Sequence, residues 1–246
     1  MRYFIEFSFN GTNYHGWQMQ SNAITVESVL SRSISIKLNE QIKLFGASRT
    51  DTGVHAVQMF AHFDTGKRFI ELDLVMKLNS FLPKDIFISS IFKVKDDVHA
   101  RFSAIDRTYQ YYISNKKNVF NSNLYIINSD LNISLMNKAC DFLLGKKDFT
   151  SFAKKHSDTN NNICNVYEAY WNHEKSELVF TIKSNRFLRN MVRSIVGTLV
   201  QVGNQNLSID SLNHIFDSRD RSESGFSVPA KGLFLTSINY PENIFK

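Results

Sequence analysis

Apolar residues near the start of the chain are separated by single residues, which is the period of a strand with one buried face. They are Tyr3, Ile5, Phe7 and Phe9. A loop rich in turn-forming residues follows at 10–22. Apolar residues then recur at helical spacing over 26–38, directly after Thr25, a residue type that caps helices. The pattern predicts a strand, a loop and a capped helix.

The rest of the first hundred residues continues this alternation of elements. It predicts strands at 42–45, 55–64 and 86–94, and a helix at 71–82 that Pro83 stops. The order strand, helix, strand, strand, helix, strand is typical of an α+β domain with helices on one face of a mostly antiparallel sheet.

The second half repeats this order without repeating the sequence. It predicts strands at 108–115, 165–173, 177–183 and 233–240, a helix at 134–144 and two later helices. We therefore expect two α+β domains, at residues 1–103 and 104–246.

The amino-acid composition indicates which kind of partner and which cellular compartment to expect. The 246 residues carry a net charge of +6, which favours a polyanionic partner such as nucleic acid. The two cysteines, Cys140 and Cys164, are too few for a disulfide framework or a zinc site, so we expect buried free thiols and no metal. The chain shows neither a signal peptide's apolar run nor a membrane-spanning run, and we expect a cytoplasmic protein.

The segment FGASRTDTGVHA, residues 45–56, is the first candidate for chemistry. An Asp in such a loop commonly bonds its own backbone in a turn, and Asp51 could do only that. Arg49 favours another interpretation, because a guanidinium beside Asp51 would keep the carboxylate ionised, as a nucleophile or base requires. We expect His55, at the start of a strand, to be structural.

The segment NRFLRNMVRSIVG, residues 185–197, is the second candidate. If it is one helix, a single face holds Arg186, Asn190, Arg193 and Gly197. An ordinary amphipathic helix with a solvated basic side explains the arginines equally well. Gly197 on that face favours close approach by another backbone.

Tyrosines and arginines lie close together in ARFSAIDRTYQYYI, residues 100–113. Tyr109 and Tyr111 would share one face of a strand, with Tyr112 on the other face and Arg101 and Arg107 nearby. Stacking on an unpaired base requires such a combination of aromatic and cationic side chains. Core tyrosines at strand spacing are the alternative.

The longest irregular segment is residues 148–162, DFTSFAKKHSDTNNN. Its basic residues Lys154, Lys155 and His156 could contact a phosphate backbone, or the segment could be an ordinary solvated loop.

Several segments together resemble the tRNA pseudouridine synthases of the TruA family. The central one, GASRTDTGVHA, is similar to the family signature that contains its catalytic aspartate. The others, in family order, are FNGTNYHGWQMQ, NSFLP, VHARFSAIDRTYQYYI, DFTSF, NRFLRNMVRSIVGTL and KGLFLTSINY. The departures are small: Thr52 and Ser48 replace a frequent alanine and glycine, and Arg189 is not a signature residue.

The resemblance implies the pseudouridine synthase fold, with two ferredoxin-like α/β-sandwich domains and a cleft between them. It implies a homodimer that isomerises uridines at tRNA positions 38–40 of the anticodon stem-loop, without cofactor or metal. The glycines around Asp51 would then let the RNA backbone come close.

The resemblance also implies a role for individual residues. Asp51 would be the catalytic nucleophile, Tyr109 would stack on the uracil and accept the C5 proton, and Arg193 would pair with the catalytic carboxylate. Arg49, Arg107 and Arg186 would join Tyr109 in binding the substrate.

Two alternatives from other functional classes stay open. A non-catalytic tRNA-binding or RNA-folding protein would explain the charge and the aromatic residues, but an idle Asp51 would repel phosphate. A hydrolase with Asp51 as nucleophile would need a second carboxylate, and the motif offers none.

Overall fold

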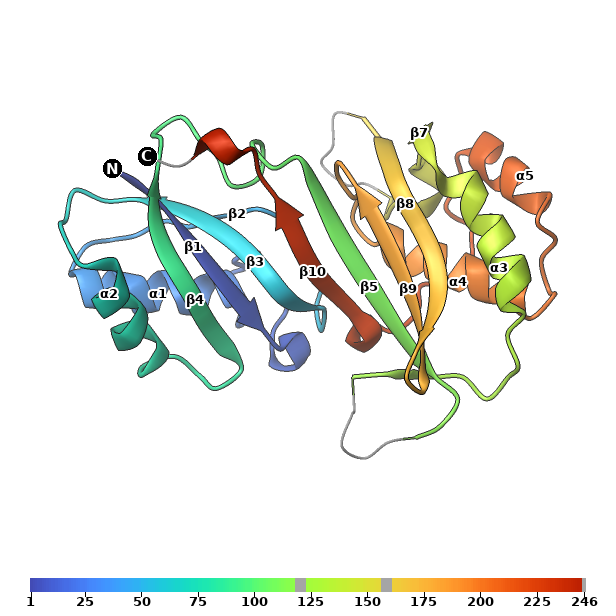
Figure 1. Cartoon of the computed structure of the whole chain (residues 1–246), viewed down its shortest axis with the longest axis horizontal. Coiled ribbons are helices and arrows are strands. Elements are labelled where there is room, and N and C mark those ends of the chain that lie inside the picture. Colours follow the sequence, from blue (N-terminus) through green and yellow to red (C-terminus); the bar gives the residue numbers. More distant parts are fainter. Residues whose placement is uncertain (118–122, 156–160, 245–246) are drawn as a thin grey trace. The chain divides into compact units, whose positions relative to one another are not determined.

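The structure is a computed structural model that describes residues 1–117, 123–155 and 161–244 (Figure 1). Its contacts divide the chain into two compact units. The first unit combines Met1–Arg107 with Leu235–Lys246, and the second is Thr108–Phe234.

The first unit contains a sheet in the strand order β4-β1-β3. Its elements are β1 (Arg2–Phe9), α1 (Val26–Leu38), β2 (Phe45–Gly46), β3 (His55–Asp64), α2 (Glu71–Asn79) and β4 (Ile86–Val94), with short 3-10 helices at Gly11–Asn13 and Glu242–Ile244. Strand β1 is antiparallel to both β3 and β4, and β2 is antiparallel to β3. This is the ferredoxin-like βαββαβ arrangement, and it confirms the predicted fold class.

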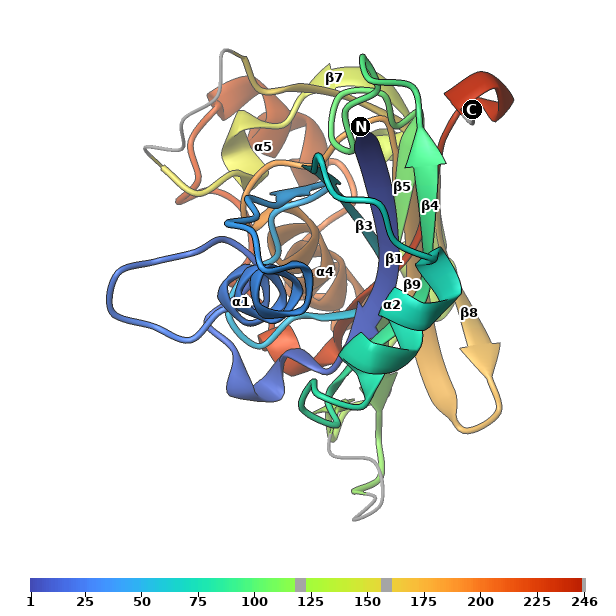
Figure 2. The same ribbon diagram turned by 90° about the vertical axis from the view of Figure 1, so that its left-hand side faces the viewer.

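Helix α1 begins where the sequence predicts, because Thr25 and Ser28 form a capping box. The Ser28 N–H donates to Thr25 Oγ1 at 3.2 Å, and the Thr25 N–H donates to Ser28 Oγ at 3.1 Å. Figure 2 shows α1 on one side of β1 and β3.

Strand β1 is buried more completely than its alternation predicts. Phe4 points to the face opposite that of Ile5, yet it is fully buried. Its ring meets that of Tyr240 edge-on at 5.3 Å and lies 6.3 Å from that of Phe60. The C-terminal segment therefore helps to cover the second face of this sheet.

The second unit has the strand order β5-β9-β8-β7. Its elements are β5 (Asp106–Ser114), β6 (Tyr125–Ile126), α3 (Ile133–Cys140), β7 (Gly145–Asp148), β8 (Ile163–Glu174), β9 (Glu177–Ser184), α4 (Met191–Gly203), α5 (Ser211–Ser218) and β10 (Leu233–Asn239), with 3-10 helices at Asp141–Leu143, Thr150–Phe152 and Ala230–Gly232. Strand β8 is antiparallel to β7 and β9, and β6 is parallel to β5. Strands β5 and β10 contribute residues to both units.

Helix α4 begins six residues later than the sequence predicts. Asn190 has a φ of 67°, in the left-handed region, so the helix cannot extend back through residues 185–189. Those residues form a loop, and the predicted helix at 185–197 is wrong in its first half.

The last residues of the chain belong with the first unit, whereas the sequence predicts a second domain of 104–246. The Ile238 N–H donates to Gln58 Oε1 at 3.0 Å, and the Tyr240 hydroxyl donates to the carbonyl of Ala100 at 2.5 Å. These partners lie 140 or more positions away in sequence, so local patterns could not reveal them.

Both cysteines are buried free thiols, as predicted. Burial raises the pKa of the Cys164 thiol to about 12 and also raises that of Cys140. Neither thiol is therefore reactive as a thiolate near neutral pH.

Candidate active site

Asp51 lies on the loop that joins β2 to β3, and its side chain is half-buried. The loop turns tightly, since the Val54 N–H donates to the carbonyl of Asp51 at 3.1 Å. Gly53 has a φ of +78°, a conformation that L residues rarely adopt. Arg49, on the same loop, is exposed.

A second loop, residues 10–17, holds this Asp51 loop in place. The Trp17 N–H donates to the carbonyl of Thr50, and the Gly53 N–H donates to the carbonyl of Tyr14, both at 3.3 Å. The Gly11 N–H donates to Nδ1 of His55 at 3.0 Å. His55 is buried and accepts a backbone hydrogen bond, which confirms the prediction that it is structural.

The glycines of residues 10–17 permit this packing. A Cβ on Gly16, whose φ is +81°, would lie 2.3 Å from the carbonyl oxygen of Thr50, and a Cβ on Gly11 would lie 1.9 Å from that of Val54. Gly46 serves a similar purpose, because its Cβ would lie 2.4 Å from the ring of Trp17. Gly46 thus accommodates this indole ring, where the sequence led us to expect room for RNA.

Asp85 fixes the loop at residues 10–17 from the other side. The Tyr14 hydroxyl donates to Asp85 Oδ1 at 2.5 Å, and Asn13 Nδ2 donates to Oδ2 at 3.2 Å. Burial and the neighbouring carboxylate raise the pKa of Tyr14. Reasoning from residue types missed Asp85 and Tyr14. The FNGTNYHGWQMQ match includes Tyr14, whereas Asp85 lies outside the matched segments.

Arg107 has a structural task. Its side chain is buried, and its guanidinium donates to the carbonyls of Ala47 and Ala104, each at 3.2 Å, and to that of Arg101. It thereby ties the start of the Asp51 loop to residues 101–104. The sequence led us to expect Arg107 on a substrate-binding surface.

In the second unit, Tyr109 and Tyr111 share the buried face of β5 and Tyr112 lies on the other, as predicted. Tyr109 meets the ring of Phe187 edge-on at 5.0 Å. The Tyr111 hydroxyl donates to the carbonyl of Pro229 at 2.8 Å, and burial raises its pKa. Tyr111 is therefore a core tyrosine, the alternative that the sequence left open.

Arg193 lies in the first turn of α4. Its Nε donates to the carbonyl of Val228 at 2.7 Å, while the Val228 N–H donates to the carbonyl of Arg193 at 3.2 Å. A Cβ on Gly197 would lie 1.8 Å from the carbonyl oxygen of Phe226. The predicted close approach of another backbone to Gly197 is confirmed.

Arg186 does not share a helix face with Arg193, because it lies in the loop before α4. Its Nη1 donates to Asn161 Oδ1 at 3.4 Å. The Lys154 N–H donates to the carbonyl of Arg189 at 3.0 Å, and the Lys155 ammonium pairs with Asp220 at 3.0 Å. His156 lies outside the described residues.

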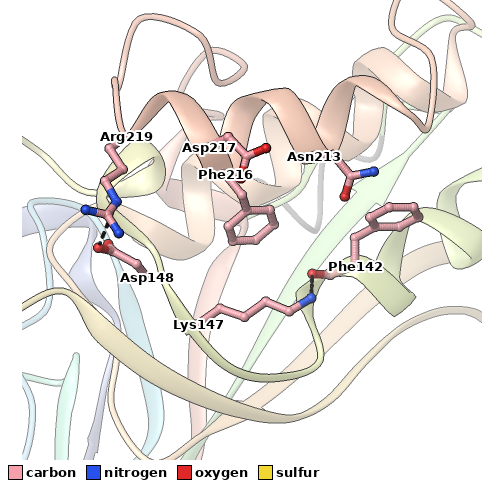
Figure 3. A pocket seen from close by; sticks show the side chains of 7 residues that line it. All are labelled: Phe142, Lys147, Asp148, Asn213, Phe216, Asp217 and Arg219. Atoms are coloured by element: carbon pink, nitrogen blue, oxygen red, sulfur yellow. Dashed lines mark hydrogen bonds and ion pairs between the residues drawn. The ribbon is translucent and has the colours of Figure 1, made fainter.

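The second unit also contains an open pocket of about 490 Å³ beside α5 and β7 (Figure 3). It is lined by Phe142, Lys147, Asp148, Asn213, Phe216, Asp217 and Arg219. Lys147 donates to the carbonyl of Phe142 at 2.5 Å, and Arg219 lies 3.5 Å from Asp148. None of the predicted site residues lines this pocket.

Two further features concern metals and membranes. Within the described part of the chain, no group of three or more His, Cys, Asp or Glu side chains could hold a metal ion. No helix among the same residues is long and apolar enough to cross a membrane.

Comparison with known proteins identifies the family. A family model described as tRNA pseudouridine synthase matches residues 6–103 and 139–241, ranges that include Asp51 and Arg193 but not Tyr109. The chain is 48% identical to tRNA pseudouridine synthase A of Azobacteroides pseudotrichonymphae genomovar. CFP2, over 100% of this chain and 99% of the relative. It is 45% identical to that of Parabacteroides distasonis (99% and 98%) and 40% identical to that of Thermoanaerobacter sp. strain X514 (96% and 98%). The chain therefore belongs to the tRNA pseudouridine synthase A family, a family of isomerases.

Proposed function

We propose that this protein converts uridine to pseudouridine at tRNA positions 38–40, with Asp51 as the catalytic nucleophile. The observation that carries the proposal is the Asp51 loop itself. Within a chain of this family, a half-buried carboxylate lies on a loop that is held to residues 10–17 by two backbone hydrogen bonds and, where it meets β3, by the bond from the Gly11 N–H to His55. A reacting group needs this kind of fixed position.

The reaction rearranges bonds without net oxidation. The N1–C1′ bond of the uridine breaks, the uracil turns, and a C5–C1′ bond forms; C5 loses its proton and N1 gains one. Asp51 attacks the ribose or the ring in its ionised form. Arg193 serves as the cationic partner that keeps it ionised away from water.

The target base must leave its stack before Asp51 can reach it, and this costs a few kcal/mol. In this proposal Tyr109 stacks on the uracil and accepts the C5 proton. Arg49 holds the place of the flipped nucleotide, Arg186 contacts the RNA backbone, and Arg107 acts indirectly by holding Ala47. The protein acts as a homodimer in the cytoplasm and holds tRNA across both subunits.

The decisive experiment uses a tRNA transcript labelled with tritium at uridine C5, without added cofactor or metal. We expect the native chain to release tritium and Asp51→Asn to release none while still binding the transcript. Sequencing of the product would locate the pseudouridine at positions 38–40.

Two results would contradict the proposal. Near-normal turnover by Asp51→Asn would exclude this residue as the nucleophile. No release from either protein, with the transcript still bound, would favour the non-catalytic tRNA-binding alternative.

A further inference from the structure

Four aromatic rings form a connected cluster on the first unit's sheet, near the end of the sheet where β1 begins. Phe45 stacks on His62 with ring centroids 4.9 Å apart and planes within 15°, and His62 meets His99 edge-on at 4.5 Å. His99 in turn lies 4.4 Å from Phe102. His62 is buried, so the cluster rests on the sheet.

The outer rings of this cluster, those of Phe45 and Phe102, are exposed, and a cationic side chain lies over each of them. Phe102 is 74% exposed and Phe45 is 37% exposed. The Arg101 guanidinium lies 5.6 Å from the centre of the Phe102 ring, and the Lys43 ammonium lies 5.0 Å from that of Phe45. Large exposed apolar side chains that lie together mark a binding surface.

The imidazoles of the cluster are fixed by backbone hydrogen bonds. Nδ1 of His62 accepts from the Ala100 N–H at 3.2 Å, and Nδ1 of His99 accepts from the Arg101 N–H at 3.0 Å. Burial lowers the pKa of His62 to about 4, with His99 and Arg2 adding to the effect, and burial also lowers that of His99. Both rings are therefore neutral aromatic surfaces at neutral pH.

Arg2 engages carboxylates that lie beside His62 and His99 in the sequence. The Arg2 guanidinium makes two hydrogen bonds to Asp64, at 2.9 and 2.7 Å, and the Arg2 N–H donates to Asp96 at 3.3 Å. Asp97 also lies close enough to help raise the pKa of Arg2. The Arg2 guanidinium therefore offsets one unit of the negative charge beside the ring cluster.

Within the same unit the cluster lies along β3 from the residue where the Asp51 loop ends. Phe45 pairs with His62, whereas the loop joins β3 at His55. Seven residues of strand separate His62 from His55 by about 23 Å.

We propose that Phe45, His99 and Phe102, with Lys43 and Arg101, form a stacking platform for an unpaired base of the tRNA substrate, outside the catalytic loop. Exposed aromatic rings stack on bases of any sequence, and the adjacent cations neutralise phosphate. The inference rests on the proposed function for the identity of the RNA.

The test measures the affinity of the full chain for a fluorescein-labelled, unmodified tRNA transcript, in an Asp51→Asn background that prevents turnover. We expect Phe102→Ala to weaken binding about 5- to 160-fold, as the loss of one base stack does. Phe102→Trp should retain most of the affinity. The matched control is Phe87→Ala, which truncates a phenylalanine of the same unit that is 56% exposed.

A second readout identifies the contact directly. A transcript that contains 4-thiouridine should crosslink on irradiation to the peptide that contains Arg101 and Phe102. In the native background, Phe102→Ala should raise the KM for tRNA more than it lowers kcat in the tritium assay.

Three results would overturn the inference. The first is unchanged tRNA affinity in Phe102→Ala, and the second is an equal loss of affinity in Phe87→Ala. The third is that Phe102→Ala dissociates into single subunits at the protein concentration of the binding measurement, and that this dissociation explains the lost affinity. The third result would show that a second copy of the chain covers the platform. Absence of tritium release from the native chain would instead contradict the proposed function. The affinities of the Phe102 and Phe87 variants for tRNA would still test the stacking platform in that case.

Discussion

The Tyr14 hydroxyl donates a 2.5 Å hydrogen bond to the Asp85 carboxylate, while the carbonyl of the same tyrosine accepts the N–H of Gly53, two residues after Asp51. One residue thus links the start of β4 to the Asp51 loop. The proposed chemistry depends on this link because a misplaced nucleophile reacts slowly.

We expect Tyr14→Phe to lower kcat more than it raises KM, and to reduce the free energy of unfolding by about 1.5–3 kcal/mol, the usual contribution of a hydrogen bond to a charged group. Tritium release and urea denaturation measure the two effects. Tyr112→Phe is the control, since its hydroxyl donates to neutral Gln110 in the other unit. Unchanged kcat in Tyr14→Phe would show that the loop keeps its position without this hydrogen bond.

Gly16→Ala should destabilise the protein by at least about 2 kcal/mol and lower turnover, because the new Cβ would meet the carbonyl of Thr50 in a strained backbone conformation. Gly66→Ala is the matched control, since its Cβ would meet nothing within 4 Å. Urea denaturation of both variants makes the comparison, and equal stability would contradict the packing described for the loop at residues 10–17.

Two effects of opposite sign compete in Gly197→Ala. Alanine is the better helix former by about 1 kcal/mol, but its Cβ would lie 1.8 Å from the carbonyl oxygen of Phe226. We expect the clash to dominate and the free energy of unfolding to fall by about 2 kcal/mol. A stabilised variant in urea denaturation would mean that residues 225–228 can move away from α4.

His62 should make the protein less stable in mild acid. Its folded pKa of about 4 lies below the unfolded value of 6.5, so the unfolded state binds the proton first. The stabilising contribution of the neutral His62 side chain is therefore complete above pH 6.5. As the pH falls from 6.5 toward 4, the free energy of unfolding decreases by about 1.4 kcal/mol per pH unit. Urea denaturation at several pH values measures the slope.

His62→Gln is the control for this pH dependence, because glutamine can accept the Ala100 N–H but does not titrate. The variant should show a flatter dependence between pH 6.5 and 4. Titration of the His62 imidazole by NMR tests the same point, and a midpoint near 6.5 would refute the prediction.

Lys154→Gln and Lys155→Gln should weaken tRNA binding and reduce its salt dependence, whereas Arg193→Gln should mainly lower kcat. We expect the smaller effect from Lys155→Gln, because Asp220 already offsets part of its charge at 3.0 Å. Affinities at several salt concentrations and kcat from the tritium assay separate these roles. Equal effects on binding from all three variants would contradict this division.

Sequence patterns predicted local structure well wherever a local interaction decides it. Strands β3 and β4 have the predicted ends, and α1 begins after its predicted cap because Thr25 and Ser28 satisfy the first N–H groups. The spacing of the tyrosines on β5 also predicted that Tyr109 and Tyr111 share one face of the strand. The segment GASRTDTGVHA, read as sequence alone, resembles the family to which the chain belongs.

Only the tertiary structure decided the features that depend on partners remote in sequence. Asn190 takes a left-handed conformation and shortens α4, Arg107 is buried against carbonyls of Ala47 and Ala104, and β10 joins the first unit through Gln58. The ring cluster around His99 likewise unites residues from three separate segments. Residue spacing encodes the faces of helices and strands, but the partner of each face is fixed only when the chain packs.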